Sequence, residues 1–306
     1  MIAAREGGEA EDRRMRVLAV GLMCGAMVCF TGLDTCAKWL GFTLPATQIV
    51  WARYVGAALI ALAASRPFSR RPSALRSRKP WLQTLRSTLL LGSTTANVLA
   101  LRQLQLSETA TISFLTPIFV ALFAGPLLGE RVGAERMVAI AVGFLGVAIA
   151  TRPGTAAFQP IVLVAIAGVL CNTGYVLATR RLAAEDAPQT TLAWTQIAGI
   201  VLLTPLLPWV WRHPAAPQVW LVMAGMGAFA AAGHALLIVA HRFAPAPALT
   251  PFSYTQLIWM IVSGVLVFGD WPSAETLIGA SLVVVCGAYL ALRERRGRRS
   301  VIDKVY

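Results

Sequence analysis

The chain has 306 residues with a formal net charge of +13, and 57% of the residues are hydrophobic while only 13% are charged. A soluble protein of this length would form about two domains, but a mean hydropathy of +0.66 excludes that organisation and indicates a membrane protein. The five cysteines are odd in number and lack metal-ligand spacing, so we interpret them as small packing residues.

Apolar segments long enough to cross a bilayer follow one another along almost the whole chain. Roughly 20 residues of apolar helix span the hydrocarbon core, where only helices or closed barrels satisfy their backbone groups. The sequence therefore predicts an all-α membrane protein with ten transmembrane helices. In chain order these are Val17–Leu40, Ala46–Ser65, Thr84–Leu104, Glu108–Leu128, Ala134–Thr151, Ile161–Arg180, Thr190–Trp211, Val219–His241, Ala246–Phe268 and Ala274–Leu292.

The basic residues fall mainly on one side of this predicted membrane. The tails 1–16 and 293–306 and the loop 66–80 are rich in arginine. Few basic residues are left near the other face, namely Lys38, Arg102, Arg152 and Arg212. The positive-inside rule then predicts that both tails are cytoplasmic. The basic C-terminal run indicates a topology signal lying against anionic lipid rather than a nucleic-acid site.

The chain repeats itself at an interval of about 140 residues. Cys29-Phe30-Thr31-Gly32 recurs as Cys171-Asn172-Thr173-Gly174, and Gly129-Glu130 recurs as Gly269-Asp270. Five spans per half is an odd number, so the halves would insert with opposite orientations, as in many carriers. We therefore expect two inverted repeats, 17–152 and 160–292, around a central cavity. The two Gly–acid pairs are interpreted as loop caps, and the prolines of the fourth and ninth segments as sites of helix kinks.

Short motifs at matching places of the two halves carry a resemblance to a known family. They are Trp51-Ala52-Arg53-Tyr54, Phe114–Phe119, Leu128–Arg131, Pro251–Tyr254, Phe268–Asp270 and Ile278–Ala280. On these motifs residues 17–292 resemble the EamA-type members of the drug/metabolite transporter superfamily, and within it the YddG-like amino acid exporters. Asp270 stands where that family usually has Glu. The resemblance implies ten helices and a cavity lined by the first, third, fourth, sixth, eighth and ninth.

Ionisable residues inside the bilayer are functional candidates because they are costly to place there. Asp34 and Lys38 are four residues apart on one helix face and are expected to pair, and Arg53 lies within plausible reach of Asp34. These three residues are candidates for gating or coupling. Two interpretations stay open: an ion pair that neutralises buried charge, or an anchor for a charged substrate.

Polar and aromatic side chains in the predicted spans form the candidate substrate site. Amides need several hydrogen-bond partners that a helix backbone does not supply, and membrane aromatics otherwise prefer the interfaces. Bonds to their own helix, or packing between helices, are the alternative roles. The candidates are Asn97, Thr116, Asn172, Tyr175, His234, Tyr254, Gln256 and Trp259.

The chain lacks the sequence motifs of a nucleotide cradle, a metal site or a nucleophile elbow. We therefore expect no catalytic activity, no cofactor and no metal, but a secondary carrier of the bacterial inner membrane that works by alternating access. Its expected partners are membrane lipid and a small molecule, an amino acid or related metabolite that is exported. The alternatives are import of a vitamin or nucleoside-like metabolite, a channel, or a membrane-embedded enzyme. Facilitated diffusion is favoured over proton antiport through Asp34 or His234, and the oligomeric state is open, with a monomer plausible.

Overall fold

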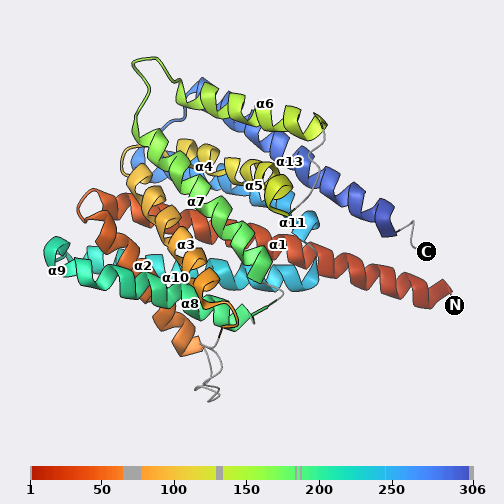
Figure 1. Ribbon diagram of the computed structural model, residues 1–306, viewed down its shortest axis with the longest axis horizontal. Helices are drawn as coiled ribbons and strands as arrows, with labels where there is room; N and C mark the ends of the chain where they lie inside the picture. Colours follow the sequence, from red (N-terminus) through yellow and green to blue (C-terminus); the bar gives the residue numbers. More distant parts are fainter. Residues whose placement is uncertain are drawn as a thin grey trace.

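The computed structural model describes residues 2–64, 77–128, 134–182, 185–186, 188–244 and 246–302. Every regular element in these ranges is helical, and the long helices run roughly side by side (Figure 1). Helix α1 begins and helix α13 ends at the same end of the molecule (Figure 1). The all-helical fold that the sequence predicts is therefore confirmed for the described part of the chain.

The helices coincide with the predicted spans, but the fourth, seventh and ninth spans are each divided into two or more elements. Their bounds are α1 Ile2–Gly41, α2 Ala46–Ala64, α3 Pro80–Leu101, α4 Leu106–Ser113, α5 Leu115–Leu128, α6 Ala134–Thr151, α7 Ile161–Leu182, α8 Pro188–Leu203, α9 Leu207–Val210, α10 Pro217–Phe243, α11 Ala246–Ser253, α12 Thr255–Ser263 and α13 Ala274–Ile302. A 3₁₀ turn, Thr204–Leu206, joins α8 to α9, and a π turn, Gly264–Phe268, follows α12. The first and last helices continue into both tails, where no proline interrupts the run of Ala, Glu and Arg helix formers.

Six stretches of the described chain are long and apolar enough to cross a membrane, and two shorter apolar helices accompany them. They are Val17–Gly41, Leu106–Phe123, Ile161–Leu182, Thr190–Val210, Pro217–Phe243 and Ala248–Phe268, with Met137–Thr151 and Ala274–Leu290. Large exposed tryptophans lie at helix ends, among them Trp81, Trp209 and Trp271. This placement is typical of the aromatic belts at membrane interfaces.

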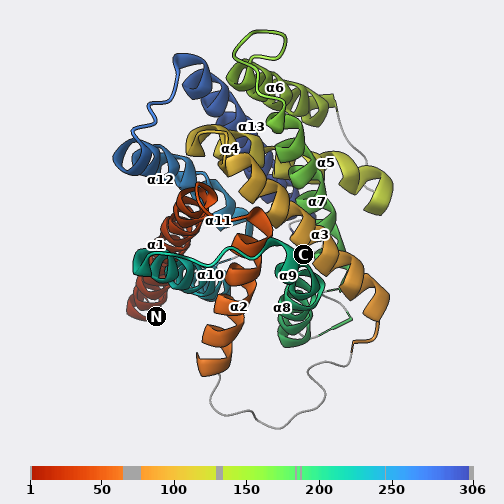
Figure 2. The same cartoon turned by 90° about the vertical axis from the view of Figure 1, so that its left-hand side faces the viewer.

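Pairs of helices from the two repeated halves form the packed interior. Helix α1 packs along α10, α3 packs along α7, and α6 packs along α13 (Figures 1 and 2). In each pair one helix comes from residues 17–152 and the other from 160–292. The halves are therefore interlocked rather than set side by side as separate domains.

Two glycine contacts let these helices approach closely. Gly56 of α2 faces Gly227 of α10, and a Cβ on Gly227 would lie 2.7 Å from the Gly56 Cα. Gly146 of α6 faces Gly279 of α13, where an added Cβ would lie 2.2 Å from the Gly146 carbonyl oxygen. Small residues at such crossings allow backbone-to-backbone packing in membranes.

We expect Gly227→Val to destabilise the protein by about 2 kcal/mol, because the new side chain overpacks the crossing of α2 and α10. Gly225→Val is the matched control, since no atom lies within 4 Å of a Cβ at that position of the same helix. The measurement is the apparent melting temperature of each variant in detergent. Equal shifts for the two variants would contradict this assignment of the crossing.

Helix breaks occur at equivalent positions of the two halves. Helix α4 ends before Phe114 and α11 ends before Tyr254, which is 140 residues later (254 − 114 = 140). At the first break, Pro117 lacks the N–H that would bond the carbonyl of Ser113. At the second, the Ser253 hydroxyl donates to the Thr250 carbonyl at 2.7 Å and loosens the helix locally.

The two breaks also meet in space. The rings of Phe114 and Tyr254 pack edge to face with centroids 4.9 Å apart. The sequence predicted proline kinks in these two segments, and the structure places the breaks at equivalent residues and in contact. This contact ties the two halves together where their helices are least regular.

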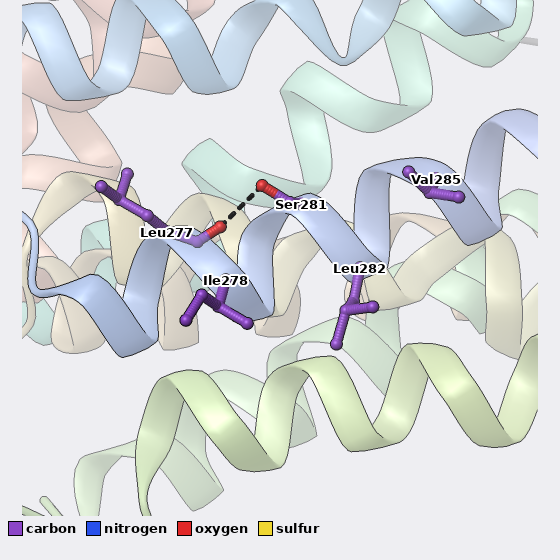
Figure 3. Close-up of a pocket in the computed structure, with 5 residues that line it drawn as sticks. All are labelled: Leu277, Ile278, Ser281, Leu282 and Val285. Atoms are coloured by element: carbon purple, nitrogen blue, oxygen red, sulfur yellow. Dashed lines mark hydrogen bonds between the residues drawn. The ribbon is translucent and has the colours of Figure 1, made fainter.

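A groove of about 360 Å³ lies along the outer side of α13. Its lining residues all come from this one helix: Leu277, Ile278, Ser281, Leu282 and Val285 (Figure 3). Ser281 donates its hydroxyl to the carbonyl of Leu277 at 2.8 Å, so the only hydroxyl among the lining residues already has an acceptor within its own helix. A face of this composition suits contact with lipid chains and lies apart from the polar residues described next.

Candidate functional site

Asp34 and Asn97 form a hydrogen bond between α1 and α3. The Asn97 amide nitrogen donates to Asp34 Oδ1 at 3.0 Å, and both side chains are half-buried. Asp34 lies seven residues before the end of α1 at Gly41, which corresponds to a depth of about 10 Å from the helix end. A carboxylate at this depth in an apolar helix is the strongest sign of a functional site in the chain.

Arg53 and His234 join this pair from two other helices. The Arg53 guanidinium on α2 donates to the Thr94 hydroxyl on α3 at 3.2 Å. Its charge interacts electrostatically with both Asp34 and His234. His234 on α10 packs its ring edge to face against Phe30, with centroids 5.1 Å apart. We call Asp34, Arg53, Thr94, Asn97 and His234 the central polar cluster, and both halves of the chain contribute to it.

Lys38 does not pair with Asp34, so the predicted i, i+4 ion pair is wrong. The Lys38 ammonium contacts Asp270 Oδ2 at 2.6 Å and the Leu104 carbonyl oxygen at 2.9 Å. It also lies 5.0 Å from the centroid of the Phe268 ring. The side chain of Lys38 reaches the end of α1, where these acceptors gather, whereas Asp34 lies one turn deeper.

The interpretation of Asp270 as a cap for the following helix also needs correction, because its carboxylate bonds to α1. Gly269 ends the π turn with a φ of 70°, a left-handed conformation that glycine adopts without strain. This turn directs Asp270 toward Lys38. The equivalent pair of the first half, Gly129-Glu130, lies outside the described residues.

Two further contacts close the same end of the molecule. Gln48 is fully buried and makes reciprocal hydrogen bonds of 2.9 Å with the carbonyl and the amide of Arg212. The rings of Trp51 and Trp211 meet edge to face at 5.9 Å. Together with Lys38 and Asp270 they join α1, α2 and the loops that follow α9 and the π turn.

Asp186 organises the opposite end. It accepts hydrogen bonds from the Ser77 hydroxyl, from the Arg78 amide at 2.9 Å and from the Gln83 amide at 2.8 Å. Burial acts to raise the pKa of Asp186, but these hydrogen bonds outweigh it and hold the pKa below its usual value. Lys79 and Glu185 add an ion pair of 2.5 Å.

Arg86 is buried between α3, α7 and α8 and is only 3% exposed. Its guanidinium donates to the hydroxyls of Thr179 and Thr195 at 2.7 Å each and to the Tyr175 hydroxyl at 3.0 Å. It also bonds the Thr191 carbonyl at 3.3 Å. No role in the site was predicted for Arg86 from the sequence. Its position inside the predicted span Thr84–Leu104 was the available signal.

The structure distributes the predicted substrate residues over several places. Asn97 and His234 lie in the central polar cluster, and the Asn172 amide donates to the Thr116 hydroxyl at 3.3 Å between α7 and α5. Tyr175 bonds Arg86. Thr94 belongs to the cluster but was not among the predicted residues. Hydroxyl side chains are common in membrane helices and the chain has many, so the sequence did not single out Thr94.

The remaining three predicted residues lie on α12 or just before it. Tyr254 is 5% exposed in this conformation and packs against Phe114 and the backbone of Gly287, so it has almost no free surface for a substrate. Gln256 is half-buried, and Trp259 is 40% exposed. No hydrogen bond among the described residues joins either of these two to the central polar cluster.

Within the described ranges, no group of three or more His, Cys, Asp or Glu side chains is close enough to hold a metal ion. The central polar cluster instead offers one anion, one cation and neutral hydrogen-bonding groups on the helices α1, α2, α3 and α10, of which α1 and α10 are long and apolar enough to cross a membrane. Such a set can hold a small polar molecule between helices. Fold and site together define a membrane transporter built from two repeats.

The chain belongs to the EamA-like transporter family, whose model matches residues 17–152 and again 159–293. A solved crystal structure shares this fold, with a TM-score of 0.63 at 18% identity, over 91% of this chain and 98% of the other.

Several transporters are similar to this chain over most of their length. An S-adenosylmethionine uptake transporter of Rickettsia prowazekii is 22% identical, over 87% of this chain and 90% of the relative. A riboflavin transporter of Vibrio cholerae is 26% identical, over 90% and 94%. A riboflavin transporter of Rhizobium johnstonii is 27% identical, over 90% and 91%.

Proposed function

We propose that the protein is a secondary carrier that takes up a small metabolite of vitamin or nucleoside type across the bacterial inner membrane. The single structural observation that supports this proposal is the central polar cluster, which sets hydrogen-bonded groups of the first half beside His234 of the second half at membrane depth. The relatives carry S-adenosylmethionine or riboflavin. They favour uptake of a metabolite, which was an alternative in the sequence analysis, over the amino acid export that the sequence alone had suggested.

The test is counterflow in liposomes that contain the purified protein and an excess of unlabelled compound. We expect labelled S-adenosylmethionine or riboflavin to accumulate above the level of protein-free liposomes. Accumulation should fall at least tenfold in Asp34→Ala, because the cluster loses its carboxylate. Net uptake by intact cells that express the protein then gives the direction. Counterflow of common amino acids alone would contradict the proposal and restore the exporter interpretation.

We further propose that the chain crosses the membrane ten times as two inverted halves, with both termini in the cytoplasm. The basic tails support this orientation, as does the location of the ends of α1 and α13 at one end of the molecule (Figure 1). The Asn172–Thr116 pair supports a cavity that extends toward the second half. Gln256 and Trp259 are proposed to line the wall that α12 forms.

Cysteine labelling in intact cells tests the orientation. Two exposed residues are each replaced by cysteine. Ala156 lies in the loop between α6 and α7, and Arg78 lies just before α3. A membrane-impermeant maleimide should label Ala156→Cys at once and Arg78→Cys only after the cells are permeabilised. The unchanged protein gives the background, since its five cysteines lie within the helices. The opposite order of labelling would overturn the proposed orientation.

A further inference from the structure

The two charges of the central polar cluster are held apart by neutral partners. Asp34 accepts from the Asn97 amide, and Arg53 donates to the Thr94 hydroxyl. The two charges interact electrostatically, yet no ion-pair contact within 4.0 Å joins them among the described salt bridges. Lys38, which lies four residues after Asp34 on α1, forms its ion pair with Asp270 instead.

Neutral partners of this kind orient a charge without cancelling it. Thr94 and Asn97 are three residues apart on α3, so they lie on the same face of that helix. One face of α3 therefore positions both the carboxylate and the guanidinium. An ion in a membrane interior without a full counter-ion is costly, and a substrate that carries the opposite charges would offset that cost.

We propose that Asp34 and Arg53 bind the head group of an α-amino acid, Asp34 its ammonium and Arg53 its carboxylate. This inference rests on the proposed uptake function and narrows its substrate class to metabolites that carry a zwitterionic amino acid group, such as S-adenosylmethionine. The guanidinium matches a carboxylate through two parallel N–H donors. The ammonium finds Asp34 Oδ2 and the Asn97 carbonyl oxygen as acceptors.

The charge balance of the cluster favours this class over a flavin. Asp34 and Arg53 together carry no net charge, and an α-amino acid head group carries none either. The ring system of riboflavin is uncharged and would leave both side chains without a counter-ion. The ring of Phe30 packs against His234 of the cluster and offers an apolar wall to the remainder of the substrate.

Binding to the purified protein tests the proposal with four probes. They are S-adenosylmethionine, its analogue without the carboxylate, its analogue without the amino group, and riboflavin. We expect each truncated analogue to bind about ten- to a hundredfold more weakly than S-adenosylmethionine, as for the loss of a hydrogen bond to a charged group. Because this series uses the unchanged protein, it does not depend on the folding of any variant.

Two variants then assign the contacts. Asp34→Asn should bind S-adenosylmethionine no more tightly than the analogue without the amino group, but still more tightly than the analogue without the carboxylate. Arg53→Gln should lose the preference for the carboxylate and keep the preference for the amino group. Equal binding of all three adenosyl compounds would overturn the head-group proposal. Counterflow of riboflavin without competition from S-adenosylmethionine would also overturn it and would leave the proposed function intact. Absence of counterflow with every compound would instead refute the proposed function itself.

Discussion

Asp270→Asn is expected to open the end of the protein at which Lys38 contacts Asp270 and to expose Cys36 on α1. The substitution leaves the ammonium of Lys38, whose side chain is only 8% exposed, without its carboxylate partner. Removing one partner of a buried ion pair is strongly destabilising, and because the Asp270 side chain is 27% exposed we expect a loss of about 2 kcal/mol.

Cys36 lies two residues from both Asp34 and Lys38 and is half-buried. If the closed arrangement loses about 2 kcal/mol, the rate at which a membrane-impermeant thiol reagent labels Cys36 should rise by up to about thirtyfold. The Cys36→Ser variant shows that the signal comes from this residue. An unchanged labelling rate in Asp270→Asn would show that the pair does not control access.

Glu275→Gln provides the matched control. It breaks the Arg152–Glu275 pair, which is 3.4 Å long with side chains 36% and 45% exposed. Exposed pairs contribute little to stability, so neither the melting temperature nor the labelling of Cys36 should change much. The double variant Lys38→Met with Asp270→Asn should regain stability, since no unpaired charge remains, but should still label rapidly.

The second large effect is expected at Arg86, where Arg86→Lys should destabilise more than Arg86→Met. Lysine keeps the buried positive charge but cannot reach acceptors on α7 and α8 at once. We expect Arg86→Lys to lose about 3 kcal/mol, which corresponds to one or two hydrogen bonds of a charged group.

Methionine removes the charge together with its need for solvation. The hydroxyls of Thr179 and Thr195 keep their own bonds to the carbonyls of Tyr175 and Thr191. The loss in Arg86→Met should therefore be about 1 kcal/mol, as replacement of a buried charge by an apolar residue is often nearly neutral. Melting temperatures in detergent give the comparison, with the exposed Arg180→Lys as control. The reverse order of the two Arg86 variants would contradict this account.

Much of the fold could be predicted from the sequence because the relevant signals are local. Apolar runs set the positions of the helices, since a bilayer requires a helix of a certain length. Pro117 predicted the irregularity in the fourth segment, since proline removes a backbone donor wherever it stands in a helix. The repeat was visible in Gly269-Asp270 and in the Cys-x-Thr-Gly motifs without any knowledge of their contacts.

The sequence predicted most residues of the candidate site but not the contacts between them. Asp34, Arg53, Asn97 and His234 were recognisable as polar residues in apolar helices, because their burial cost is a property of each residue. Their partners were not recognisable. Spacing predicted Lys38 as the partner of Asp34, but the structure gives Asp34 a partner 63 residues away and Lys38 one that is 232 residues away.

The sequence by itself thus determined the membrane fold, the two repeats and the set of residues that must be satisfied inside the bilayer. Only the tertiary structure decided which of these residues form hydrogen bonds or ion pairs with one another. It joined Lys38 to Asp270 across the two halves. It also showed that Arg86, one of many basic residues in the sequence, links α3 to α7 and α8 by hydrogen bonds. The physical reason is that helix formation depends on neighbours along the chain, whereas the pairing of buried charges depends on which helices pack together.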